Sequence, residues 1–179
     1  MHNIKLEQKQ NNLHSTKKKN IILGIDPGST TIGYGVIGCE DKSRKPKALD
    51  YGYIDLKNYR KQEEKLLHLN KDLKHIFKKY NPDYIAIESI YFFKNAKTFT
   101  AVSEAKGVIL LTAAEARIDI HEYTPLQVKQ TISGYGKADK KFIEKLIQSS
   151  LDICSRIKPD DSSDALAIAL CHYHHLTNV

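Results

Sequence analysis

Two short apolar segments of this chain each end in a carboxylate, and this feature constrains the fold more than any other. Residues 20–26 are Asn-Ile-Ile-Leu-Gly-Ile-Asp, and residues 84–88 are Tyr-Ile-Ala-Ile-Glu. Short runs rich in β-branched residues, the first stopped by a Pro-Gly pair, are typical of strands buried on both faces. An acid without a partner is costly in such a strand. We therefore expect Asp26 and Glu88 to meet a compensating group.

The rest of the hydrophobic pattern predicts an α/β protein with a mixed sheet covered by helices. Further strands are expected at 31–39, 48–56 and 118–123, and the first three strands are predicted to form an antiparallel meander. Helices are expected at 61–80, 95–117, from Pro125 to about 133, at 137–151, and from 160–163 onward. In the helix at 137–151, we expect Phe142, Leu146 and Ile147 to face the core.

Length and composition limit the protein classes that remain. The 179 residues are enough for one core, so we expect one domain over 20–179. Residues 1–19 hold five lysines and one acid, and we expect them to form a disordered basic arm. No apolar run approaches the roughly 18 residues that cross a membrane. Three widely spaced cysteines favour a reducing, cytoplasmic location, and a net charge of +7 is compatible with a nucleic-acid partner.

The predicted last helix supplies two more acids. Asp161 and Asp164 are three residues apart and therefore project from one helical face. If they meet Asp26 and Glu88, four anions converge, and Mg²⁺ or Mn²⁺ would relieve their repulsion. A pair of such ions assists hydrolysis of a phosphodiester in the nucleic-acid backbone. Capping of the helix start is the alternative role for Asp161 and Asp164.

Several motifs occur in one order along the chain and together resemble those of a known family. They are Ile-Leu-Gly-Ile-Asp-Pro-Gly-Ser (22–29), Gly-Tyr-Gly-Val-Ile (33–37), Pro-Asp-Tyr-Ile-Ala-Ile-Glu (82–88), Lys-Asn-Ala (94–96), Gln-Val-Lys-Gln-Thr (127–131) and Asp-Ser-Ser-Asp-Ala-Leu-Ala-Ile-Ala (161–169). The chain closely resembles the bacterial RuvC family of Holliday-junction resolvases, from about Ile21 to His175.

The resemblance implies a ribonuclease-H-like fold, with three antiparallel strands followed by two parallel ones. It also implies a symmetric homodimer that makes paired nicks in a four-way DNA junction, in homologous recombination and DNA repair, beside the RuvA and RuvB branch-migration proteins. Asp26, Glu88, Asp161 and Asp164 match the four metal-binding acids of the family. We expect these acids to be catalytic and to hold Mg²⁺, or Mn²⁺, with two ions per subunit.

The resemblance also implies residues that contact DNA. Lys129 and Lys140 match family lysines near the active site, and Lys137 and Lys141 accompany Lys140 around the start of a predicted helix. Tyr91 takes the place of a phenylalanine that stacks on a base at the crossover. A tyrosine retains the aromatic face that such stacking needs, and Phe92 and Phe93 are neighbouring alternatives.

Other functions remain open at this stage. The opening Ile-Asp-Pro-Gly also occurs in actin-like and sugar-kinase ATPases, but those proteins need two large lobes that 179 residues cannot supply. A ribonuclease-H-like nuclease acting on ribosomal RNA precursors is the closer alternative, and an inactive junction-binding scaffold is a third. The small residues of the helix at 95–117 favour that helix as the dimer face.

Overall fold

The computed structural model describes residues 20–40, 45–89 and 96–177. The strands are β1 (Asn20–Asp26), β2 (Thr31–Cys39), β3 (Lys47–Asp55), β4 (Tyr84–Glu88) and β5 (Asp119–Tyr123). The helices are α1 (Gln62–Tyr80), α2 (Ala96–Ala116), α3 (Pro125–Ser133), α4 (Lys140–Leu151) and α5 (Asp160–Thr177). The predicted basic arm (1–19) and Tyr91 lie outside the described residues. Within the described ranges, no helix is long and apolar enough to cross a membrane.

The five strands form one mixed sheet in the order β3-β2-β1-β4-β5. The pairs β1–β2 and β2–β3 are antiparallel, whereas β4 runs parallel to β1 and β5 runs parallel to β4. Parallel neighbours need a crossover connection, and α1 and α2 lie in the two connections concerned. The predicted sheet of three antiparallel strands followed by two parallel strands is confirmed.

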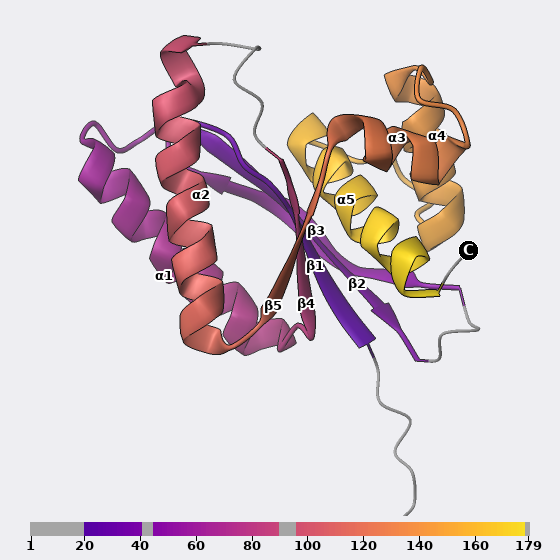
Figure 1. Ribbon diagram of the computed structural model, residues 1–179, viewed down its shortest axis with the longest axis horizontal. Helices are drawn as coiled ribbons and strands as arrows, with labels where there is room; N and C mark the ends of the chain where they lie inside the picture. The colour runs from indigo at the N-terminus through magenta and orange to yellow at the C-terminus, as the bar shows by residue number, and fades with distance from the viewer. Residues whose placement is uncertain (1–19, 41–44, 90–95, 178–179) are drawn as a thin grey trace, which may run out of the picture.

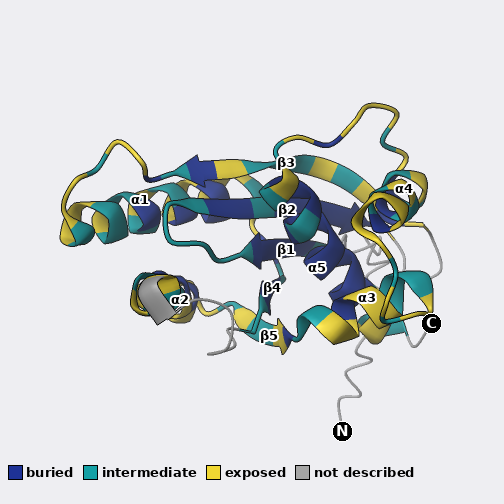
Figure 2. Ribbon diagram, turned by 90° about the horizontal axis from the view of Figure 1, so that it is seen from above, coloured by how far each residue is buried: buried dark blue, intermediate teal, exposed yellow. Residues whose placement is uncertain are grey.

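Helices cover both faces of this sheet. Helices α1 and α2 lie on one face, and α5 lies on the other with α3 and α4 beside it (Figures 1 and 2). Side chains alternate between the faces along each strand. Leu23 and Ile25 of β1 therefore join the apolar cluster under α1 and α2, while Ile22 joins the cluster around α5.

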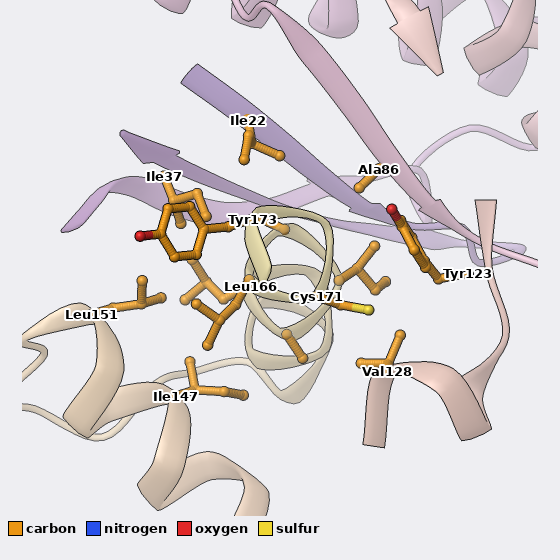
Figure 3. Close-up of a cluster of buried hydrophobic side chains, with 14 of the residues drawn as sticks. Ile22, Ile37, Ala86, Tyr123, Val128, Ile147, Leu151, Leu166, Cys171 and Tyr173 are labelled. Carbon is orange, nitrogen blue, oxygen red and sulfur yellow. The ribbon is translucent and has the colours of Figure 1, made fainter. Parts of the chain in front are cut away.

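Helix α5 is the most deeply buried element. Every residue from Ala165 to Tyr173 is buried. Figure 3 shows its side chains, Leu166 and Cys171 among them, between the sheet, α3 and α4. A helix that is apolar all round belongs inside a protein, so α5 organises the layer on its side of the sheet.

Glycines bring the backbone of α5 into direct contact with the sheet. A Cβ atom on Gly24 of β1 would overlap the carbonyl oxygen of Ala165 and lie 2.7 Å from the backbone nitrogen of Ala169. On β2, a Cβ on Gly35 would lie 2.8 Å from Cγ of Leu166, and one on Gly33 would overlap the backbone of Asp161. No larger residue allows this approach.

The predicted inward face of α4 is partly wrong. Phe142 is 48% exposed, whereas Ile143, Ile147 and Leu151 are buried. Phe142 and Ile143 begin two neighbouring apolar stripes that are rotated by about 100° on the helix. The stripe that starts at Ile143 is the longer of the two, since Ile147 and Leu151 continue it, and it packs against the α5 cluster.

We expect Gly24→Ala to lower the free energy of unfolding by about 1–3 kcal/mol or more, because the new methyl group meets backbone atoms that cannot move independently. Urea denaturation followed by circular dichroism measures this change. Gly52→Ala on β3 is the matched control, since a Cβ there meets mainly the hydroxyl end of the Tyr34 ring, at 2.9 Å. Equal losses in the two variants would contradict the close approach of α5.

Candidate active site

The register of the parallel strands brings the two sheet acids together. Ile25 of β1 pairs with Ile87 of β4, so Asp26 and Glu88 follow at the same end of adjacent strands. Alternation places both acids on the face of the sheet that carries α5, because Ala86, two residues before Glu88, belongs to the α5 cluster.

The first turns of α5 carry the other two acids to the same place. Asp26 pairs with Gly33 across the β1–β2 hairpin, and the backbone of Asp161 lies directly over Gly33. The glycine contact therefore brings Asp161 beside Asp26. Asp164, nearly one turn further along α5, lines a pocket together with Glu88. All four acids singled out in the sequence lie at one site.

Asp26 interacts electrostatically with the other three carboxylates. Burial, followed by the charges of Glu88, Asp164 and Asp161, raises the pKa of Asp26 to about 8, against a weaker opposing effect of Lys140. Burial also raises the pKa of Asp164, an effect that Lys140 partly offsets. Like charges that share a partly buried site disfavour the ionised form.

Lys140 is paired with two aspartates at the start of α5. Its Nζ donates a hydrogen bond to Oδ2 of Asp164 at 3.1 Å and lies 3.3 Å from Oδ2 of Asp160. Burial lowers the pKa of Lys140, but Asp164 and Asp160 outweigh this effect and leave the pKa above its usual value. The sequence analysis missed Asp160. Its position four residues before Asp164, on the same helical face, was the available signal.

The pocket beside Asp164 has a volume of about 260 Å³ and combines both charge signs. Glu88 and Asp164 line it with Lys129 and Lys140, and the apolar part comes from Val128 of α3, Ile143 of α4 and neighbouring residues. The structure thus brings Lys129 and Lys140 to the acids. Lys137 and Lys141 are exposed and do not line this pocket.

Helix caps fix the two elements that carry these lysines. At the start of α3, Oγ1 of Thr124 accepts from the backbone N–H of Gln127, and Oε1 of Gln127 accepts from that of Thr124, which forms a capping box. At the start of α4, Oδ1 of Asp139 accepts from the backbone N–H of Phe142 at 2.9 Å. Each cap sets where its helix begins and therefore where its lysine lies.

The donor chemistry of the site matches a hard divalent cation. Carboxylate oxygens are the ligands that Mg²⁺ and Mn²⁺ prefer, and the repulsion around Asp26 is what such an ion would relieve. Among the described residues, no three His, Cys, Asp or Glu side chains already form a ligand set for one ion. One of the acids, Asp164, is engaged by Lys140.

The sheet order, with carboxylates at the ends of β1 and β4 and near the start of α5, defines a nuclease of the ribonuclease-H-like class. The family model described as "Crossover junction endodeoxyribonuclease RuvC" matches residues 22–172. The protein of that name from Caldicellulosiruptor saccharolyticus is 48% identical over 151 residues, which cover 84% of this chain and 90% of the relative. The one from Clostridioides difficile is 44% identical over 154 residues, covering 86% and 90%.

Solved structures agree with this family. Thermus thermophilus RuvC in complex with Holliday junction substrate superimposes with a TM-score of 0.83 at 27% identity, covering 89% of this chain and 96% of that one. A fowlpox virus resolvase, at 16% identity and a TM-score of 0.57, shares the fold. The chain belongs to the RuvC family of crossover junction endodeoxyribonucleases. These findings favour junction resolution over the ribosomal-RNA nuclease that the sequence left open.

The raised pKa of Asp26 predicts how stability depends on pH without divalent cations. The folded state binds this proton more tightly than the unfolded state, whose aspartate pKa is near 3.8. This contribution to stability is therefore complete below about pH 4 and is lost as the pH rises toward about 8. Asp26→Asn should remove that loss. The free energy of unfolding of the variant, relative to that of the parent, should therefore rise by a few kcal/mol across this pH range, at about 1.4 kcal/mol per pKa unit.

Thermal melts in EDTA from pH 4.5 to 9 measure this difference. Asp119→Asn, on an exposed aspartate at the start of β5, is the control and should follow the parent at every pH. If the melting temperatures of Asp26→Asn and the parent also stay parallel, Asp26 does not titrate as a member of a carboxylate cluster.

Proposed function

We propose that this protein resolves Holliday junctions by making paired symmetric nicks through metal-assisted hydrolysis of the DNA backbone. The convergence of Asp26, Glu88, Asp161 and Asp164 beside a pocket that also contains lysines carries this proposal. Acids at this density suit hydrolysis of a phosphodiester, since a phosphate group needs both charge neutralisation and an activated water. The nuclease domain in this proposal spans residues 20–179.

We infer that the four acids hold Mg²⁺, or Mn²⁺ in its place, with two ions per subunit. When bound, these ions supply an activated water and neutralise charge on the leaving oxygen. The carboxylates orient this chemistry from rigid elements, because Asp26 and Glu88 end strands while Asp161 and Asp164 belong to the buried helix α5. A bound divalent cation would also attract the carboxylates around Asp26, whose charges otherwise repel one another.

The lysines are proposed to bind the DNA backbone. Lys129 and Lys140 share the pocket with the acids, so they hold the phosphate to be cut and offset its charge. Lys137 and Lys141 are exposed outside the pocket and contact phosphates further along the strand. Tyr91, outside the described residues, is proposed to stack on a base at the crossover.

A symmetric homodimer would give two equivalent sites for the two equivalent strands of a junction. We infer that α2 forms the dimer contact, because its solvent face carries a stripe of small and apolar residues between the acids Glu104 and Glu115. Gly107, Leu111 and Ala114 follow each other at helical spacing and are exposed, with Leu111 59% exposed. The absence of a side chain on Gly107 would allow a second copy to approach closely.

We further propose that the protein works beside the RuvA and RuvB branch-migration proteins, which supply mobile junctions. We also propose that it acts in the cytoplasm, where recombining DNA would present the junctions that it cuts. These two proposals follow from membership of the family and from the junction as substrate.

We expect Asp26→Asn to bind a synthetic four-way junction with parental affinity while losing at least about a hundredfold in cleavage, since a carboxylate central to metal-assisted catalysis is removed. Gel analysis of end-labelled strands with Mg²⁺ measures cleavage, and anisotropy without Mg²⁺ measures binding. Asp119→Asn is the control and should cut at the parental rate. Parental cleavage by Asp26→Asn would exclude the proposed role of the acid cluster, and intact junctions with the parent protein would exclude resolution itself.

We expect Leu111→Glu to convert the protein from a dimer to a monomer, because a charge would be buried against its own copy. Light scattering coupled to size exclusion measures the mass. Leu67→Glu on α1, where the leucine is 56% exposed, is the matched control and should remain dimeric. If the Leu111→Glu variant still has the mass of a dimer in solution, the dimer contact lies elsewhere.

A further inference from the structure

Three large apolar side chains are exposed on the segment that builds the rim of the active-site pocket. Leu126 of α3 is 54% exposed, Tyr135 between α3 and α4 is 60% exposed, and Phe142 of α4 is 48% exposed. Leu126 directly follows the pocket residue Pro125, and Phe142 directly precedes the pocket residue Ile143. Single exposed apolar residues are common, but a group on one active-site segment indicates a contact surface.

The backbone holds Tyr135 in place. Its N–H donates to Oγ of Ser133 at 3.2 Å, and its carbonyl oxygen accepts from the N–H of Ala138 at 3.2 Å. Gly134, at φ 69°, ends α3 in the left-handed conformation that glycine favours. The side chain of Leu126 lies against Gly136, where a Cβ would meet its Cδ1 at 2.5 Å. The turn is therefore fixed, and it presents the Tyr135 ring to solvent.

Helix α4 presents the Phe142 ring in a similar way. The backbone N–H of Phe142 is bound by the cap residue Asp139, and the next side chain, Ile143, is packed in the core at 8% exposure. The helix cannot rotate to bury Phe142 without exposing Ile143 and Ile147. Both aromatic rings are thus held at the surface by well-packed neighbours.

The surroundings of these rings are cationic. The segment 125–151 carries five lysines and two acids, and one of these lysines, Lys140, is paired with Asp164 and Asp160 of α5, which leaves an excess of lysines on the segment. Both acids have other partners, because Asp139 caps α4 and Oε1 of Glu144 lies 3.9 Å from Nε of Arg156. A fixed surface that combines aromatic rings with lysines complements a polyanion that also offers flat π faces, and nucleic-acid bases provide those faces.

We propose that Tyr135 and Phe142 stack on bases exposed at the branch point of the junction and so select branched DNA over continuous duplex. This proposal rests on the proposed function. In a continuous duplex, each base face is covered by its neighbours and offers nothing to an aromatic ring. Where strands exchange, stacking is interrupted and base faces become accessible. The lysines bind either form of DNA through phosphate, whereas the rings contribute only on branched DNA.

Anisotropy titrations with the full chain in EDTA test this proposal, using a four-way junction and a linear duplex of the same sequences. We expect Tyr135→Ala and Phe142→Ala each to weaken junction binding about tenfold and to leave duplex binding within about twofold. Tyr135→Phe and Phe142→Tyr keep the aromatic face and should bind as the parent does. Phe142→Leu keeps apolar bulk without that face and should lose affinity as Phe142→Ala does.

Salt titrations separate stacking from charge. The aromatic variants should keep the parental slope of log affinity against log salt, whereas Lys141→Ala should flatten it by removing a phosphate contact. Leu67→Ala on α1 is the control for an exposed apolar residue elsewhere and should change neither affinity. A melting temperature equal to that of the parent establishes that a variant is folded. If an alanine variant melts at a lower temperature, the comparison of Phe142→Tyr with Phe142→Leu still tests the need for an aromatic face.

Two results would overturn the proposal: unchanged junction binding, or equal losses of affinity for junction and duplex. The cleavage assay distinguishes these results from failure of the proposed function. If the parent makes paired nicks but the alanine variants bind junctions normally, only the stacking proposal fails. If the parent makes no nicks but the alanine variants lose junction binding selectively, the stacking surface stands and the catalytic proposal fails.

Discussion

Direct contact between the backbone of α5 and the sheet is the constraint on which the rest of this structure depends. Glycines at 24, 33 and 35 remove the side chains that would hold the helix away. Because Gly33 pairs with Asp26 and also lies under Asp161, the same contact that packs the core brings acids from two elements together. Packing and chemistry therefore share one interface, and a loss of close approach would affect both.

The carboxylates of the site built on this contact repel one another. Asp26 is partly buried among like charges, and its pKa near 8 expresses the cost of ionising it there. Lys140 offsets part of that charge through Asp164, which ties the start of α4 to the acids on α5. The family to which this chain belongs explains why an arrangement that is unfavourable for the isolated protein is present. An endodeoxyribonuclease acts on a charged DNA backbone, so its site is built to meet charged groups.

Sequence reasoning found, from local pattern alone, the four acids that the structure brings together. Asp26 and Glu88 stood out because acids end otherwise apolar strands, and Asp161 and Asp164 because their spacing places them on one helical face. It failed on α4, where the prediction placed Phe142 in the core although Ile143, Ile147 and Leu151 form the longer apolar stripe, and this stripe packs against the α5 cluster. It also missed Asp160, although the spacing of four residues between Asp160 and Asp164 was the available signal. The ion pair of Asp160 with Lys140 joins residues that are distant in the chain, so that partner could not be read from spacing along one helix.

The sequence by itself determined the strands and helices, the mixed sheet and the four acids, because alternation, helical periodicity and strand-ending carboxylates are local properties. Only the tertiary structure decided how deeply α5 lies on the glycines, which lysines enter the pocket and which apolar side chains remain in solvent. Those features depend on the register between β1, β2 and β4 and on the packing of α3, α4 and α5. Both arise from contacts between residues far apart in the chain, which no local pattern encodes.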